Sequence, residues 1–301
     1  MGRQRHNPPN MAQICREYLA YFKNTRQSGR VQKRGIQKVI RAFSDYLDVS
    51  QIQLSDLKIE HVDAFLAAFK TPYAPSTRQL YRSYLRCFLR YLYHERNLLP
   101  QDLAELVVGP PMFAKAKPPK FLRPHEIRQL FDHLPYSTHC ELRTYAMVHL
   151  AFFLGLRPCE ISQITLDDIS FSKAQLILRH RKNNRPLQLP IPESTLKAIT
   201  AYIVGARPKV EHRFLFVLLV TPYNPIDAAL VGRYLTRALC NAGIDATPYW
   251  LRHTYAQNLL EADATLFEIK EMLGHDSIES TRKYLSIHTA LMRKVLFDEI
   301  L

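Results

Sequence analysis

The sequence lacks the features that mark membrane and exported proteins. Its longest unbroken apolar run, FLFVLLV at 214–220, is too short to cross a bilayer and predicts a buried strand. The N-terminal segment MGRQRHNPPN is charged and has neither an apolar core nor a small-residue cleavage site, so we expect no secretory signal. We therefore expect no membrane partner and a cytoplasmic location.

The sequence also lacks the residue patterns of disulfide, metal and nucleotide sites. Its five cysteines are odd in number and scattered, and no CxxC pair occurs, which argues against a disulfide framework and a zinc site. No P-loop and no carboxylate cluster with ligand spacing is present. We therefore expect no metal and no other cofactor, and we expect the cysteines to be reduced and to be mostly packing residues.

Acidic residues are scarce in the first part of the chain. The net charge is +14, and residues 1–120 hold 20 Lys and Arg against 9 Asp and Glu, while the rest of the chain is nearly balanced. A basic excess confined to one region suggests a surface that faces a polyanion, and nucleic acid is the partner we expect. A basic surface that serves only solubility is the alternative.

A proline-rich and lysine-rich stretch divides the chain. GPPMFAKAKPPKFLRP at 109–124 holds five prolines and three lysines, a composition that forms neither helix nor sheet. We predict a helical domain at 1–110, a linker at 111–120 and a second domain at 121–301. The linker lysines suit contacts along DNA phosphates, although linkers are often basic for solvation alone; they are Lys115, Lys117 and Lys120.

The residues before the linker have helical periodicity in four segments, near 10–24, 30–48, 59–69 and 76–98. The last segment has two different faces. One is apolar, with Leu80, Tyr84, Leu85, Phe88, Leu89 and Leu92. The other is basic, with Arg78, Arg82, Arg86 and Arg90 at every fourth position and no acid between them. We predict that these arginines contact a DNA groove or its phosphates; a simply solvated face is the alternative.

The residues after the linker predict a mixed domain. Segments 122–134 and 141–155 read as helices, the second ended by Gly155, and three short strand-like runs follow at 166–171, 174–180 and 185–191. Helical patterns return from Glu193 onward, apart from the run at 214–220. The predicted fold class is mainly α, with an all-helical N-terminal domain and an α+β domain that contains a small antiparallel sheet.

Four stretches of the second domain carry candidate chemistry. They are LGLRPCE with Arg157, RHRKNNRP with Lys182, TPYWLRHTY with Arg252, and LGHDSIESTRKYL with His275 and Tyr284. In this order and spacing they resemble the tyrosine recombinase (phage integrase) family, whose catalytic domain is related to that of type IB topoisomerases. The resemblance covers the whole chain and implies the DNA breaking-rejoining fold, with a core-binding domain at the front.

The resemblance also implies roles for these residues. Arg157 and Arg252 would clamp the phosphoryl oxygens, which suits the geometry and charge of guanidinium groups. Tyr284 would be the nucleophile, and Lys182 would protonate the leaving 5′-oxygen. His275 would hydrogen-bond the scissile phosphate, and Glu160 would support Arg157. Taken singly, three of them have a structural alternative: Arg157 as a helix cap, Lys182 as a solubilising residue at a hairpin tip, and Arg252 as an ion-pair partner of Glu261 or another acid.

One position departs from the family pattern. Three residues before Arg252, where the family usually has histidine, this chain has Tyr249. A phenol cannot accept a proton near neutral pH, but it can donate a hydrogen bond to a phosphoryl oxygen. His253 follows Arg252 and points about 100° away from it on a helix, so we do not expect it to compensate.

The resemblance implies a site-specific recombinase or integrase that works through a 3′-phosphotyrosyl intermediate, without metal or ATP. Its expected partners are duplex DNA with a recombination site and further copies of the chain, as a tetramer on DNA near the nucleoid, with the tail at 289–301 docking on a neighbour. After Gly274, a capping box of Asp276 and Glu279 would begin a helix at 277–286. Two alternatives remain open: a non-catalytic DNA-binding relative and a topoisomerase that relaxes any supercoiled plasmid.

Overall fold

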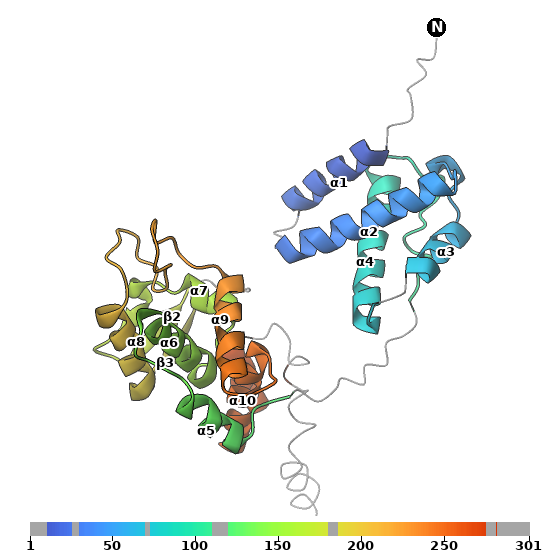
Figure 1. Cartoon of the computed structure of the whole chain (residues 1–301). Helices are drawn as coiled ribbons and strands as arrows, with labels where there is room; N and C mark the ends of the chain where they lie inside the picture. The colour runs from blue at the N-terminus through green and yellow to red at the C-terminus, as the bar shows by residue number, and fades with distance from the viewer. Residues whose placement is uncertain are drawn as a thin grey trace, which may run out of the picture. The chain divides into compact units, whose positions relative to one another are not determined.

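The computed structural model of the chain describes residues 11–25, 30–69, 73–109, 120–179, 186–274 and residue 281. The chain forms two compact units, Met1–Ala114 and Lys115–Leu301, each with its own apolar core. Figure 1 shows both units. Among the described residues, no helix combines the length and the apolar character needed to cross a bilayer.

The first unit is a helical bundle. It contains α1 (Met11–Thr25), α2 (Arg30–Val49), the short 3₁₀ helix η1 (Leu54–Asp56), α3 (Ile59–Phe69) and α4 (Pro75–His94). These helices lie where the sequence periodicity predicts them. Aromatic rings fill much of the core: Tyr18 of α1 meets Phe88 of α4 with ring centroids 5.0 Å apart, and Phe43 of α2 meets Phe65 of α3 at the same distance.

Helix α4 buries most of its predicted apolar face, but the prediction for Leu80 is wrong. The buried residues of α4 are Tyr84, Leu85, Phe88, Leu89, Tyr91 and Leu92. Leu80 is 48% exposed. Tyr91 lies on the same flank of α4 as Leu80, three turns further along the helix. It packs on Tyr18 of α1, with 5.1 Å between the ring centroids, so this flank is covered there. The buried stripe of α4 therefore begins after Leu80.

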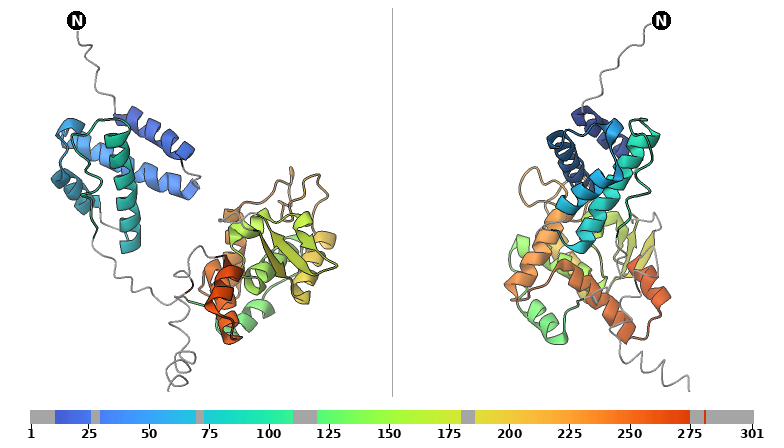
Figure 2. Two further views of the ribbon diagram at one scale, coloured as in Figure 1. Left: turned by 180° about the vertical axis from the view of Figure 1, so that it is seen from behind. Right: turned by 90° about the vertical axis from the view of Figure 1, so that its right-hand side faces the viewer.

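The second unit is built around one buried helix. Its helices are α5 (Pro124–Asp132), α6 (His139–Phe153), α7 (Pro158–Gln163), α8 (Glu193–Gly205), α9 (Ala228–Asn241), α10 (Pro248–Glu261) and α11 (Leu266–Leu273). Helix α6 is buried along most of its length and packs against α8, α9 and α10. Figures 1 and 2 show these helices gathered into one layered body with the small sheet beside them.

The sheet has three antiparallel strands in the order β1-β2-β3, as predicted. A 3₁₀ turn, η2 (Leu166–Asp168), leads into β1 (Ile169–Ser170), which pairs with β2 (Gln175–Leu178), and β2 pairs with β3 (Leu187–Pro190). Leu176 is opposite Leu189, and both side chains face the core. The mainly α fold with one small antiparallel sheet is thus confirmed.

The prediction of a strand at 214–220 is wrong, because the segment does not form the hydrogen-bond ladder of a strand with any part of the chain that the structure describes. Residues 215–217 are completely buried, as an apolar run should be. The segment makes only isolated bridges within the described residues, from Phe214 to Thr165 and from Val217 to Pro225. An apolar run indicates burial, but a strand also needs a partner of matching length, and the loops on either side provide none.

Histidine 149 of α6 lies in the core of this unit among Phe131, Tyr145 and Phe153. It is 3% exposed, and neither ring nitrogen has a hydrogen-bond partner in the described part of the chain. Burial lowers its pKa to about 4 from an ordinary value of 6.5. Between these pH values the unfolded chain binds a proton that the folded chain does not, so the stability of the protein falls as the pH is lowered, by up to about 1.4 kcal/mol per pH unit.

We expect His149→Leu to remove this pH dependence. Thermal unfolding at pH 7 and pH 5 should show a larger gain in Tm over the wild type at the lower pH. His139→Gln is the matched control, because His139 is exposed and its substitution should leave the pH dependence unchanged. An equal gain in Tm at both pH values would contradict the assignment of the effect to His149.

Candidate functional site

A tight turn after α6 brings Arg157 to the site. Gly155 has φ +60, the left-handed region, and the chain then enters α7 with Arg157 as its extended N-cap residue. The backbone N–H of Arg157 donates to Oε2 of Glu160 at 2.8 Å, which caps the helix. The sequence placed Arg157 just past a helix end; the structure places it at the start of the next helix.

Glu160 joins the two predicted phosphate clamps. Nη1 of Arg157 donates to Oε1 of Glu160 at 2.9 Å, and Nη1 of Arg252 lies 3.6 Å from Oε2. The Glu160 side chain is 5% exposed. A single buried carboxylate therefore holds two guanidinium groups together, which confirms the supporting position predicted for Glu160 beside Arg157 and leaves the cluster with a net positive charge.

Arg252 reaches this cluster from the second turn of α10. Its side chain is 5% exposed. Nη1 donates to the carbonyl of Gly155 at 2.5 Å, and Nη2 donates to the carbonyl of Leu273. Arg252 therefore pairs with an acid, as the structural alternative expected, but the acid is Glu160 and not Glu261, which accepts a hydrogen bond from Gln257. Arg252 thus ties the turn after α6 to the end of α11.

The end of α11 completes the described cluster. Nη1 of Arg157 also donates to the Leu273 carbonyl, at 3.4 Å. Gly274 follows with φ +60 and ends α11, as the sequence predicted. Thr265 and Glu268 form a capping box at the other end of α11. The described part of this segment therefore ends at the two arginines, one residue before His275 in the sequence.

Tyr249 lies beside Arg157. Burial acts to lower the pKa of the Arg157 side chain, but the carboxylate of Glu160 and the hydroxyl of Tyr249 outweigh it and raise this pKa. Tyr249 is 51% exposed. His253 is one turn further along α10, and its ring centroid is 5.7 Å from that of Tyr249. The residue at the usual histidine position therefore has a phenol accessible to solvent and next to a guanidinium.

Three of the predicted catalytic residues, Lys182, His275 and Tyr284, lie outside the described residues. The base of the predicted Lys182 hairpin is described: Nε of Arg179 donates to the nearly buried Asp168 at 2.8 Å. Of the predicted helix 277–286, residue Thr281 is described, and it is helical and fully buried.

The predicted DNA-contacting arginines of α4 differ from one another. Nε of Arg78 donates to the carbonyl of Tyr73 at 2.6 Å, and Arg82 packs against the backbone of Gly109. Arg86 and Arg90 are exposed, and neither forms an ion pair within the described part of the chain. Among the predicted linker contacts, Lys120 is described and exposed, while Lys115 and Lys117 lie outside the described residues.

The sequence did not reveal that backbone carbonyls anchor the arginines. The carbonyls of Gly155 and Leu273 hold Arg252, yet a backbone acceptor leaves no trace in residue identity. A weak signal exists in retrospect, because both residues lie at helix ends, where carbonyl groups lack partners within the helix.

Gly155 offers a test of this anchoring. A Cβ atom at residue 155 would clash with Cδ1 of the Tyr255 ring, and the left-handed backbone adds strain for any other residue. We expect Gly155→Ala to lower the free energy of unfolding by about 3 kcal/mol. DNA cleavage should fall as well, because the carbonyl that holds Arg252 moves. Urea denaturation measures the first effect and single-turnover cleavage measures the second.

Gly232 is the matched control for this substitution. It lies in the interior of α9, and a Cβ atom there would meet nothing within 4 Å. Gly232→Ala should stabilise the protein by about 0.5–1 kcal/mol, because alanine restricts the unfolded chain and favours a helix. If both substitutions were neutral, the turn at Gly155 would not need its left-handed backbone.

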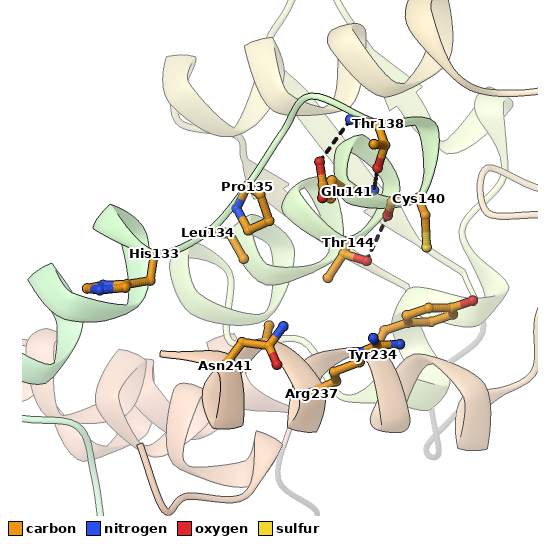
Figure 3. A pocket seen from close by; sticks show the side chains of 11 residues that line it. His133, Leu134, Pro135, Thr138, Cys140, Glu141, Thr144, Tyr234, Arg237 and Asn241 are labelled. Carbon is orange, nitrogen blue, oxygen red and sulfur yellow. Dashed lines mark hydrogen bonds between the residues drawn. The ribbon is translucent and has the colours of Figure 1, made fainter. Parts of the chain in front are cut away.

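A separate cavity of about 220 Å³ lies between α9 and the start of α6 (Figure 3). The Thr138–Glu141 capping box is at its rim, and Tyr234, Arg237 and Asn241 of α9 form the facing wall. None of its lining residues belongs to the arginine cluster. It is therefore not the candidate catalytic site.

Comparison with protein families covers both units. The family described as "Phage integrase family" matches residues 120–290, and "Phage integrase, N-terminal SAM-like domain" matches residues 15–96. Tyrosine recombinase XerC of Bacillus subtilis is 27% identical over 297 residues, 95% of each chain. A Sinorhizobium fredii protein with the provisional name integrase/recombinase y4rF is 31% identical over 251 residues, which are 80% of this chain and 58% of that protein.

Solved structures share the fold. XerH site-specific recombinase bound to a palindromic difH substrate has a TM-score of 0.77 at 16% identity, covering 98% of this chain and 90% of that chain. A lambda integrase dimer bound to a COC′ core site has a TM-score of 0.67 at 17% identity, covering 89% and 95%. With family matches over both units and the arginines meeting at one carboxylate, the chain belongs to the phage integrase family of tyrosine recombinases.

Proposed function

We propose that this chain is a site-specific DNA recombinase in which Tyr284 attacks a backbone phosphate, giving a 3′-phosphotyrosyl bond and a free 5′-hydroxyl. The observation that carries the proposal is the pairing of Arg157 and Arg252 through Glu160. Two converging guanidinium groups match the charge and the geometry of a phosphodiester that becomes more negative during attack.

Each remaining group has a role in this reaction. The Tyr249 hydroxyl, next to Arg157, donates a hydrogen bond to a phosphoryl oxygen. Lys182 protonates the leaving 5′-oxygen, and His275 hydrogen-bonds the phosphate. The positive cluster favours the phenolate form of Tyr284 over the phenol. The phosphotyrosyl bond keeps the energy of the broken linkage, so rejoining requires neither ATP nor a metal ion.

DNA binding involves both units. On α4, Arg86 and Arg90 face solvent, which suits contacts with the groove or the phosphates. Arg78 binds the Tyr73 carbonyl and Arg82 packs on Gly109, and both add positive charge to α4. Lys115, Lys117 and Lys120, in the segment that joins the units along the chain, contact DNA phosphates in this proposal. In this proposal 1–110, 111–120 and 121–301 act as core-binding domain, linker and catalytic domain.

Recombination joins two duplexes, and each duplex needs two cleavages. We propose that a homotetramer on DNA, with the tail at 289–301 of each copy docking on a neighbour, satisfies this requirement. Because its substrate is DNA, the proposed location is the cytoplasm, at the nucleoid. Relatives solved with DNA support binding and cleavage of DNA, but not a particular number of copies: XerH was solved in a post-cleavage complex, and lambda integrase as a dimer on its core site.

Formation of a covalent adduct tests the proposed function. The DNA site is first selected from a randomised duplex pool with the full chain. A duplex with this site and a nick next to the scissile phosphate then traps the intermediate, in EDTA and without ATP. We expect a protein–DNA adduct that resists denaturation and maps to Tyr284 by mass spectrometry. Site binding without any adduct would indicate a non-catalytic relative, and relaxation of any supercoiled plasmid would indicate a topoisomerase.

A further inference from the structure

A second group of cations lies next to the first turn of α10, and the catalytic cluster does not use it. A solvent-open cavity of about 400 Å³ is lined by Lys120, Phe121, Arg123, His125, Glu126 and Trp250. Lys120, Arg123 and His125 are exposed, and none of them forms an ion pair within the described residues. Three basic side chains from six consecutive residues thus surround one hollow.

The acidic residue in this group already has a partner. Oε2 of Glu126 accepts a hydrogen bond from the backbone N–H of Arg123 at 2.7 Å and caps α5. The first turn of α5 adds the positive end of the helix dipole on the same side. The basic side chains therefore outnumber the carboxylate, and the hollow favours an anion. A phosphodiester is the anion that guanidinium and ammonium groups recognise on DNA.

Two contacts fix this basic segment to α10. Nζ of Lys120 lies 5.3 Å from the centre of the Trp250 ring, within the range of a cation–π interaction. The backbone N–H of Leu122 donates to Oγ1 of Thr254 at 2.9 Å, and this hydroxyl donates to the Trp250 carbonyl at 2.7 Å. Leu122 is 1% exposed. The residues at 120–123 are thus attached to the helix that carries Tyr249 and Arg252.

We propose that Lys120, Arg123 and His125 bind a backbone phosphate of the DNA next to the scissile phosphate, and that Trp250 is a positioning residue that holds Lys120 for this contact. Trp250 follows Tyr249 directly on α10, so a phosphate held in the hollow also fixes α10 against the DNA. Binding of the duplex at this site is thereby coupled to the placement of Arg252. The inference rests on the proposed function for its ligand, DNA, but the test of the phosphate site itself does not require cleavage.

Trp250 is the only tryptophan of the chain, so its fluorescence reports on this site alone. The probe is a short duplex of mixed sequence, and its binding is followed separately by the anisotropy of a labelled strand. We expect bound duplex to reduce acrylamide quenching of Trp250 about twofold or more. In the double variant Lys120→Gln/Arg123→Gln this protection should disappear, and the negative slope of log K against log salt should become shallower by about 0.9 for each phosphate that the variant no longer neutralises. Bound duplex that leaves quenching unchanged would overturn the proposal.

Lys197→Gln is the control for loss of charge. Lys197 is a residue of α8 that is 76% exposed and paired with Glu193, and its variant should keep both the protection and the salt slope of the wild type. If the slope became equally shallow in this control, only the net charge of the protein would matter for binding. That result would also overturn the phosphate site.

The positioning role needs a readout beyond binding. With saturating protein on the nicked duplex, Trp250→Ala should slow adduct formation about tenfold, while Trp250→Phe, which keeps an aromatic face for Lys120, should remain within about twofold of the wild type. Equal defects in the two variants would overturn the role of the ring. If the wild-type protein forms no adduct but duplex still protects Trp250, the recombinase proposal fails and the phosphate site stands.

Discussion

Replacing Tyr284 with phenylalanine is expected to abolish the covalent protein–DNA adduct while leaving DNA affinity within about twofold. Phenylalanine keeps the ring and removes the oxygen that forms the bond to phosphorus, so the loss should be complete. Denaturing gels of a reaction on the nicked duplex measure the adduct, and anisotropy of a labelled duplex measures affinity. Tyr284 follows Gly274 by ten residues. A fully extended chain of that length spans roughly 35 Å, which is the largest possible distance between their Cα atoms.

Tyr249→Phe is the matched control, because it removes the hydroxyl group of a tyrosine that lies next to Arg157. It should slow adduct formation by about 10²-fold, the cost of one hydrogen-bond donor to the developing charge, without abolishing it. The reverse result, in which Tyr249→Phe removes the adduct and Tyr284→Phe does not, would make Tyr249 the nucleophile. Loss of DNA affinity in Tyr284→Phe would point to a structural role for Tyr284 instead.

The sequence identified the two arginines of the site through the ordered motifs that resemble the tyrosine recombinase family. The chemistry agrees with that resemblance, because a phosphodiester needs donors of fixed geometry and permanent charge, which Arg157 and Arg252 can supply. How they are held was not predictable. Their anchors include the Gly155 and Leu273 carbonyls, and every residue carries the same carbonyl group, so only the folded backbone decides which of them face a guanidinium.

The helices could be predicted where the apolar periodicity is long. Burial and strand pairing could not be predicted where they depend on tertiary contacts. Helices α2 and α4 repeat their apolar residues over five turns, and both lie where predicted. Leu80 shares the pattern of α4 but is not covered by a neighbouring helix, which no local signal reveals. The run at 214–220 is buried at its centre without forming a strand, because a strand depends on a partner elsewhere in the chain.

Tyr249, at the position where the family usually has histidine, shows how one departure from the family pattern changes the site. Tyr249 cannot serve as a base near neutral pH, yet its hydroxyl interacts with Arg157, where it can donate to a phosphoryl oxygen. The sequence predicted that His253 points away from Arg252; it did not predict that His253 lies against the Tyr249 ring. Spacing of four residues places 249 and 253 on one face of α10, so the contact follows from helical geometry.

Replacing Arg252 with lysine is expected to slow adduct formation by about 10²–10³-fold even though the charge is kept. The Arg252 guanidinium binds the Gly155 carbonyl with one nitrogen and the Leu273 carbonyl with the other, and it approaches Glu160 at 3.6 Å. A single ammonium group cannot reach all three acceptors. At least one buried carbonyl loses its partner, which should lower the free energy of unfolding by about 1–3 kcal/mol.

Arg213→Lys is the control for this variant. It tests whether the protein tolerates an arginine-to-lysine substitution elsewhere. Arg213 also forms hydrogen bonds to a carboxylate, Asp167, but both side chains are more than half exposed. Water and the flexibility of the pair compensate for the altered geometry, so this control should leave adduct formation and stability unchanged. If Arg252→Lys were equally harmless, charge alone would suffice at this position. The carbonyls of Gly155 and Leu273 would then not orient the guanidinium for catalysis.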